Sequence, residues 1–216
     1  MPVDFDLYLI TDRHQTGGRD LPTVVGEALA GGARAVQLRE KDLSSRELYE
    51  LALELRKLTE RHGARLIIND RIDIALAVNA DGVHLGKESI PIHRARKLLG
   101  PTRLIGVSCH NQICALTAEE NGADFITFGP VFFTPSKAQY GEPVGTDKLE
   151  TVAQQLKMPV FGLGGINLRN TPQVLNAHAH GIALISAIIA APEPARAAQD
   201  LLAAIAGVKA QSPVTD

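Results

Sequence analysis

The sequence has little cysteine, few aromatic residues and no tryptophan. Its 216 residues include two cysteines, Cys109 and Cys114, and aromatic residues make up 4 % of the chain. Two thiols without a matching set of cysteines and histidines exclude a zinc signature, and such sparse use is typical of a reducing compartment. The shortage of aromatic side chains argues against a platform on which nucleic-acid bases stack.

An excess of positive charge and long apolar runs are also absent. The formal net charge is −2, so no basic surplus indicates binding to nucleic acid. No apolar run reaches the length of a membrane span, and acidic residues precede the first apolar run, which is the wrong charge order for a secretory signal. We expect a cytoplasmic protein with no nucleic-acid or membrane partner. A local cationic cluster can still bind a small anion.

What the sequence does contain is eight short β-rich runs separated by helical patterns. The runs cover residues 7–11, 35–40, 65–70, 82–86, 104–108, 125–131, 159–165 and 181–188. In the clearest helical stretch, Ser44 or Ser45 is the expected cap, an apolar stripe follows, and Gly63 comes after its end. Strict alternation of strand and helix predicts a parallel sheet with helices outside it. Eight such units in a chain of this length predict an α/β fold, a single (β/α)₈ barrel.

A doubly wound open sheet is the alternative. Such a sheet usually has fewer strands and often has a phosphate loop after its first strand, but "ITDRHQTGGRD" is neither a G-x-G-x-x-G motif nor a Walker loop. No linker rich in proline, glycine or serine divides the chain. We therefore predict one barrel domain over residues 1–208 and a frayed tail over residues 209–216.

Polar residues occur at the carboxyl end of nearly every predicted strand, which is the functional face of a parallel barrel. In "AVQLREKD" the period of two predicts that Gln37, Arg39 and Lys41 lie on one side of the strand. Two cations with a side-chain amide suit the oxygens of a phosphate or pyrophosphate. The alternative is a salt bridge between Arg39 and Glu40 at the rim, with Lys41 in solvent.

Two other strand ends carry candidate catalytic groups. Asn69 and Asp70 end the third run. A carboxylate beside a cationic cluster can hold Mg²⁺, which a pyrophosphate would bridge. The alternative is that Asn69 or Asp70 caps the following helix. His110, after the fifth run, is either an acid–base group or a structural hydrogen bonder. We expect His84 to be structural.

Three further segments can bind phosphate or carboxylate groups. The loop "FTPSK" offers two hydroxyls and an ammonium group, and is otherwise an ordinary surface turn. "GLGGI" and "LISAI" end the seventh and eighth runs, where barrels often hold a phosphate on backbone N–H groups. The residues of these segments are Thr134, Ser136, Lys137, Gly164, Gly165, Ile185 and Ser186.

The chain resembles the thiamine phosphate synthase family, which includes the closely similar thiazole tautomerases. The resemblance covers nearly the whole chain. The segments that carry it are "QLREK", "IINDRIDIAL", "ADGVHLG", "IGVSCH", "GADFITFGPVFFTPSK" and "VFGLGGI". It implies a transferase that joins hydroxymethylpyrimidine pyrophosphate to thiazole phosphate and releases thiamine phosphate and pyrophosphate.

The resemblance also implies a role for each candidate residue. Pyrophosphate would lie on the cluster that ends the second run and on Asn69, Mg²⁺ on Asp70, and thiazole phosphate on Gly165 and Ser186. The expected catalytic residues are Arg39, Lys41, Ser108, His110 and Lys137. The expected substrate-binding residues are Gln37, Arg39, Lys41, Asn69, Ser108, Thr134, Ser136, Lys137, Gly164, Gly165, Ile185 and Ser186.

One segment departs from the family pattern. The family usually has a second Mg²⁺-binding acid after the fourth strand, in a "G-Q-x-D" pattern, whereas this chain reads "GKES". Ser89 stands where that acid is expected. Glu88 turning inward and Lys87 neutralising phosphate are two ways to compensate. The third alternative is that the protein does not handle pyrophosphate.

That departure leads to two other functions. A thiazole tautomerase uses neither pyrophosphate nor Mg²⁺, and His110 would be its acid–base group. A non-catalytic barrel would instead bind thiamine-pathway phosphates as a regulator. Tautomerases tend to lose the equivalents of Lys41 and Asp70, which this chain retains, so we predict the synthase, with Mg²⁺ as cofactor. Its partners are phosphorylated small molecules, and the sequence leaves a homo-oligomer open.

Overall fold

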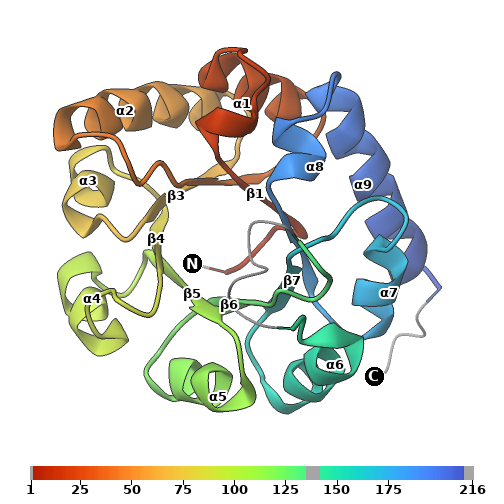
Figure 1. Cartoon of the computed structure of the whole chain (residues 1–216). Helices are drawn as coiled ribbons and strands as arrows, with labels where there is room; N and C mark the ends of the chain where they lie inside the picture. Colours follow the sequence, from red (N-terminus) through yellow and green to blue (C-terminus); the bar gives the residue numbers. More distant parts are fainter. Residues whose placement is uncertain (1, 135–141, 212–216) are drawn as a thin grey trace.

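The computed structural model describes residues 2–134 and 142–211. They form a closed barrel of eight parallel strands in chain order, in which β8 pairs with β1. Figure 1 looks down this barrel and shows the helices as an outer ring. The predicted α/β class and (β/α)₈ architecture are therefore confirmed, and the open doubly wound sheet is excluded.

Each predicted β-rich run contains one strand. The strands are β1 (Leu7–Ile10), β2 (Ala35–Leu38), β3 (Arg65–Asn69), β4 (Gly82–Leu85), β5 (Leu104–Cys109), β6 (Phe125–Phe128), β7 (Val160–Leu163) and β8 (Gly181–Leu184). Most are shorter than predicted, because the chain turns away at the carboxyl end. β2 ends at Leu38, Arg39 follows it and Lys41 lies in a turn, so the prediction that Gln37, Arg39 and Lys41 lie on one side of a strand is wrong.

The helices alternate with the strands. They are η1, a 3₁₀ helix (Arg13–Gln15), α1 (Leu21–Ala30), α2 (Ser45–Arg61), α3 (Ile72–Ala77), α4 (Ile92–Leu99), α5 (Gln112–Glu120), α6 (Gly145–Gln155), α7 (Thr171–Asn176), α8 (Ser186–Ile189) and α9 (Pro194–Lys209). The sequence dictates α2 most plainly. Ser44 and Glu47 form a capping box, Leu48, Ala52 and Leu55 are buried, and Gly63 follows in the left-handed region.

The core has two layers, because alternate residues of each strand face opposite sides. One layer fills the space between strands and helices. The other fills the barrel and is dominated by the rings of Phe5, Tyr8, Phe125 and Phe161. These rings pack at centroid distances of 5.2 to 6.1 Å. The aromatic layer fills the barrel interior. The inward-facing polar residues nearer the carboxyl ends of the strands therefore pack against a closed apolar layer.

The carboxyl end of the chain follows α9, which continues to Lys209. Residues 212–216 lie outside the described residues, so the frayed tail and the domain limit at residue 208 stay predictions. Within the described ranges, no helix combines the length and apolarity needed to cross a bilayer.

Candidate active site

A buried carboxylate holds the end of β2 in place. Glu40 is 5 % exposed, and the Thr11 hydroxyl donates to its Oε1 over 2.6 Å. The backbone N–H of Arg13 donates to both carboxylate oxygens, at 3.2 and 3.1 Å. The backbone N–H of Arg39 donates to Thr11 Oγ1 at 2.9 Å. Glu40 thus ties β2 to the loop after β1, and the alternative of a salt bridge between Glu40 and Arg39 is wrong.

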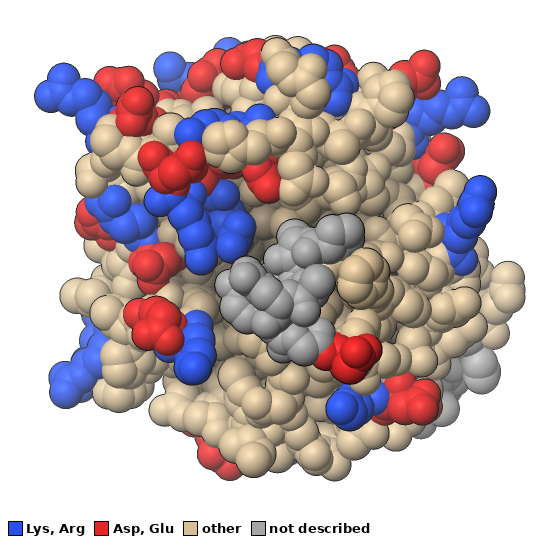
Figure 2. Space-filling model, in the orientation of Figure 1, with Lys and Arg blue, Asp and Glu red and all other residues tan. Residues whose placement is uncertain are grey.

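This arrangement leaves two cations beside the mouth without an anionic partner. Arg39 is half-buried and Lys41 is exposed. Neither side chain has a hydrogen bond or ion pair to any other described residue. Arg13 takes the nearby acids instead, and its contact holds the pKa of Asp42 well below the usual range. Figure 2 shows lysine and arginine side chains gathered beside the centre of this face, where an anion can reach them.

Asp70 follows β3 and has a left-handed backbone, with φ of 62°. Its N–H donates to the carbonyl of His84 at 2.9 Å, which fixes the turn. Its carboxylate is exposed and has no hydrogen bond or salt bridge within the described ranges. No side chain caps α3, and Arg71 occupies the cap position. The alternative that Asn69 or Asp70 caps this helix is therefore wrong.

The turn after β4 is closed by a hydroxyl, because Ser89 Oγ accepts from the backbone N–H of Gly86 at 2.8 Å. Lys87 and Glu88 are both exposed. Residues 2–134 and 142–211 contain no group of three or more His, Cys, Asp or Glu side chains that could hold a metal ion. Asp70 therefore offers one carboxylate. That fits Mg²⁺, which commonly binds one or two carboxylates and takes waters and substrate phosphates as its other ligands.

Below the mouth, a chain of hydrogen bonds crosses the barrel interior. Gln37 is 1 % exposed, and its Nε2 donates to the Tyr8 hydroxyl at 2.9 Å. That hydroxyl lies 3.3 Å from His84 Nδ1, and His84 Nε2 lies 3.0 Å from Ser108 Oγ. The chain links two of the predicted substrate-binding residues, Gln37 and Ser108, through two side chains that the barrel buries completely.

The protonation of this chain follows from its burial. Burial raises the pKa of Tyr8. Burial, with the nearby charge of Arg39, lowers the pKa of His84 to about 3. The phenol therefore keeps its proton and donates to Nδ1, and neutral His84 carries its proton on Nε2 and donates to Ser108. The Ser108 hydroxyl is left to donate its own proton to a ligand. The burial and hydrogen bonds of His84 agree with the prediction that it is structural.

His110 lies just past β5 and is exposed. Its Nδ1 hydrogen-bonds the carbonyl oxygen of Gly129. Since a carbonyl only accepts, Nδ1 carries the proton, and neutral His110 has its lone pair on Nε2. The contact is structural, and it also orients the ring, so it agrees with either role predicted for this residue.

The ends of β7 and β8 bring backbone close to the same mouth. Gly164 and Gly165 both have positive φ, 101° and 65°. A Cβ on Gly165 would lie 2.6 Å from the carbonyl oxygen of Phe133, so only glycine fits here. Ile185 is half-buried and Ser186 is exposed where α8 begins. Thr134 is half-buried. Ser136 and Lys137 lie outside the described residues, so their roles stay predictions.

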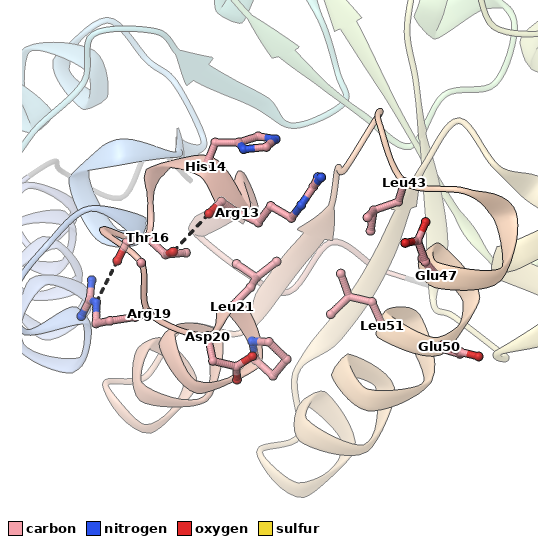
Figure 3. Close-up of a pocket in the computed structure, with 12 residues that line it drawn as sticks. Arg13, His14, Thr16, Arg19, Asp20, Leu21, Leu43, Glu47, Glu50 and Leu51 are labelled. Atoms are coloured by element: carbon pink, nitrogen blue, oxygen red, sulfur yellow. Dashed lines mark hydrogen bonds between the residues drawn. The ribbon is translucent and has the colours of Figure 1, made fainter.

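A groove also lies outside the barrel, between the loop after β1 and the start of α2. Figure 3 shows Arg13 and His14 on one side of it and Glu47 and Leu51 on the other. Its lining includes none of the residues predicted for the site. The groove is therefore separate from the residues predicted for the site.

Four residues that shape the mouth were not predicted for the site: Tyr8, Thr11, Thr127 and Glu40, which was considered only as a partner of Arg39. Thr127 Oγ1 lies 3.4 Å from His84 Nε2, and the others hold β1, β2 and β4 together as described above. The strand period predicts that Tyr8 and Thr127 face inward. Nothing in the local sequence indicates that Glu40 bonds Thr11, which is 29 positions away.

The fold and the mouth together define the class. This is a (β/α)₈ barrel in which Arg39, Asp70 and Ser108 follow or end strands at their carboxyl ends, and the side chains of Arg39 and Asp70 have no hydrogen bond or ion pair within the described residues. Residues 7–188 match the TMP-TENI family model, described as thiamine monophosphate synthase, and the chain belongs to that family.

Individual relatives agree with this assignment. A Geobacter sulfurreducens protein is 64 % identical over 93 % of this chain and 94 % of its own length. A thiamine-phosphate synthase of Chloroflexus aurantiacus is 46 % identical over 94 % of each chain. Among solved structures, a thiamine phosphate pyrophosphorylase from Pyrococcus furiosus has a TM-score of 0.87 and 39 % identity, with 94 % of this chain and 96 % of that chain covered.

Proposed function

We propose that this chain is a thiamine-phosphate synthase, a transferase that joins hydroxymethylpyrimidine pyrophosphate to thiazole phosphate. The products are thiamine phosphate and pyrophosphate. Family membership and relatives that carry the synthase name over nearly the full length support this function. The observation that carries it is that Arg39 and Lys41, which follow β2, have no hydrogen bond or ion pair with any residue that the structure describes.

The reaction needs charge stabilisation more than a strong base. The C–O bond to pyrophosphate breaks and leaves a carbocation that the pyrimidine stabilises, and the thiazole nitrogen then captures it. Negative charge grows on the departing pyrophosphate, so preorganised cations lower the barrier most. We assign this task to Arg39 and Lys41, helped by Asn69. Glu40 is tied to Thr11 and Arg13, and therefore does not neutralise them.

The remaining polar groups hold the two substrates together, which supplies much of the rate gain in a bimolecular reaction. The Ser108 hydroxyl, fixed by His84, donates to the substrate above it. Backbone N–H groups at Gly164, Gly165, Ile185 and Ser186 suit the thiazole phosphate, because barrels commonly bind phosphate after their last two strands. Thr134, Ser136 and Lys137 are assigned by resemblance.

Asp70 would hold Mg²⁺, which when bound adds positive charge beside the pyrophosphate. Ser89 stands where the resemblance predicts a second acid, and its hydroxyl accepts from the backbone N–H of Gly86. We propose that Asp70 is the protein's only carboxylate ligand and that the exposed ammonium of Lys87 supplies the missing charge.

The test combines purified protein with both phosphorylated substrates and Mg²⁺ and measures thiamine phosphate and pyrophosphate. Equal amounts of the two products are expected. A parallel reaction contains the thiazole carboxylate phosphate isomer alone. Aromatisation of that isomer without any thiamine phosphate would replace the synthase by the tautomerase, with His110 as its acid–base group. Tight ligand binding with neither reaction would indicate the regulator.

A further inference from the structure

The two cysteines lie together behind the active-site end of β5. Cys109 is the last residue of β5 and Cys114 lies in the first turn of α5. Their Sγ atoms are 2.8 Å apart, and both thiols are free. Cys109 belongs to the layer between strands and helices, whereas its neighbour Ser108 bonds His84 in the interior. The function proposed above uses neither thiol.

The two thiols differ in exposure to solvent and in pKa, which are the properties that separate an attacking thiol from a resolving thiol. Cys109 is completely buried, and Cys114 is half-buried. Cys114 lies near the amino end of a helix, where its own N–H is held by Asn111 Oδ1 at 2.8 Å. The contact with Cys109 lowers the pKa of Cys114 to about 7, and the same contact, with burial, raises the pKa of Cys109. Cys114 is therefore the accessible thiol that ionises first.

We propose that Cys109 and Cys114 form a redox-active dithiol, a modification site that closes to an intramolecular disulfide when the protein meets a low-molecular-weight disulfide. The sulfurs need to approach by roughly 0.8 Å to reach bonding distance. The five-residue separation places the bond between the end of β5 and the start of α5. The segment that it closes contains His110, which lies beside the mouth.

The exchange proceeds in two balanced steps. The Cys114 thiolate attacks one sulfur of the small disulfide, whose S–S bond breaks and releases one thiolate. Cys109 then loses its proton and attacks the Cys114 sulfur, which displaces the second thiolate. The two protein thiols are oxidised, the small disulfide is reduced to two thiols, and the two protons pass to those thiols.

The experiment equilibrates the folded protein in glutathione buffers of increasing oxidised fraction. The mixtures are quenched with acid, alkylated, and analysed by intact mass. We expect one oxidised species that has lost two hydrogens, blocks alkylation of both cysteines together and carries no glutathione. Far-UV circular dichroism of the oxidised protein should match that of the reduced protein, because closure requires little movement.

Two variants separate the roles. Cys109→Ser should accumulate a stable mixed disulfide on Cys114, because no second thiol resolves it. Cys114→Ser should resist modification until it is denatured, because Cys109 is buried. Wild-type protein that keeps two alkylatable thiols in the most oxidising buffer would overturn the proposal. A persistent glutathione adduct on wild type, or equally fast adduct formation on both variants, would also overturn it.

Discussion

At the residue scale, Arg39 and Glu40 are neighbours of opposite charge after β2, and the structure places them in different environments. Glu40 is buried and bonds the loop after β1, whereas the Arg39 guanidinium has no partner within residues 2–134 and 142–211. In the mechanism that we propose, Arg39 stabilises the departing pyrophosphate, and a carboxylate paired with it would weaken that effect. We therefore expect the burial of Glu40 to matter for function as well as for stability. The two roles can be separated by substitution.

Arg39→Ala should lower turnover by roughly 10²–10³-fold, by analogy with the loss of one donor to a developing oxyanion. Unfolding in urea should change little, because the Arg39 side chain makes no hydrogen bond or ion pair with the described residues. Arg46→Ala is the matched control, since Arg46 is exposed on α2. A loss of stability as large as the loss of turnover would make Arg39 structural.

Glu40→Gln should destabilise the fold by about 1–3 kcal/mol. An amide has one accepting oxygen in place of two, and its NH₂ group would face the Arg13 N–H and guanidinium that donate to Oε2. The measurement is equilibrium unfolding in urea at neutral pH. The exposed Glu50 provides the control Glu50→Gln, which should leave the midpoint unchanged. Equal changes in unfolding free energy for the two substitutions would contradict a stabilising role for the bonds from Thr11 and Arg13 to Glu40.

His84 links stability to pH. The pKa of His84 in the folded chain is about 3, and a histidine in an unfolded chain titrates near 6.5. Between these values the unfolded state binds a proton that the folded state does not. The contribution of His84 is therefore complete above about pH 6.5 and is lost as pH falls, by about 1.4 kcal/mol per pH unit.

His84→Asn should remove that contribution. The difference in unfolding free energy between pH 6.5 and pH 5 should shrink by about 2 kcal/mol relative to the native protein. The exposed His93 supplies the control His93→Asn, which should retain the native difference. An unchanged pH dependence in His84→Asn would mean that the folded protein protonates His84 as readily as the unfolded chain does. Nδ1 would then carry a proton at the lower pH, and the Tyr8 hydroxyl could not donate to it.

At the element scale, β5 has Gly106 where the side chains of Phe125 and His84 approach it closely. A Cβ on Gly106 would lie 2.4 Å from the ring of Phe125 and 2.6 Å from His84 Nδ1. Such contacts require the rings to move. Because Gly106 has no side chain, His84 on β4 has room to reach Ser108, which lies two residues further along β5.

Gly106→Ala should destabilise the protein by about 1–3 kcal/mol and lower activity, because it displaces both rings. Gly207→Ala is the control, since no atom lies within 4 Å of its added Cβ. That substitution in α9 should stabilise by up to about 1 kcal/mol through helix propensity. Thermal melting with parallel turnover measurements tests both. An unchanged melting temperature and turnover in Gly106→Ala would contradict the close packing of Phe125 and His84 against Gly106.

At the scale of the whole molecule, the alternation of strands and helices was enough to predict the barrel, because a strand period of two and short connections leave few other arrangements. The strand ends were harder to predict. β2 stops at Leu38, so Lys41 reaches its position through a turn, which the strand period does not describe. Element boundaries depend on such turns and on bonds between strands.

The interior contacts were the least predictable part. Thr11 and Glu40 become partners only because β1 and β2 are neighbours in the closed barrel. Tyr8 and Ser108 likewise meet through His84 across the barrel, from strands that are far apart in the chain. A local pattern fixes the direction of a side chain but not its distant partner. The barrel geometry was needed to distinguish Glu40, which bonds Thr11 and Arg13, from Arg39, which has no partner among the described residues.

The central claim is that the charges at the end of β2 receive the departing pyrophosphate at the barrel mouth. The most direct measurement is the dissociation constant of inorganic pyrophosphate, determined by calorimetry in Mg²⁺ buffer for the native protein, Arg39→Ala and Arg46→Ala. Loss of one charged hydrogen-bond donor should weaken binding by roughly 10- to 150-fold in Arg39→Ala and leave Arg46→Ala unchanged. Equal affinity in all three proteins would contradict the claim.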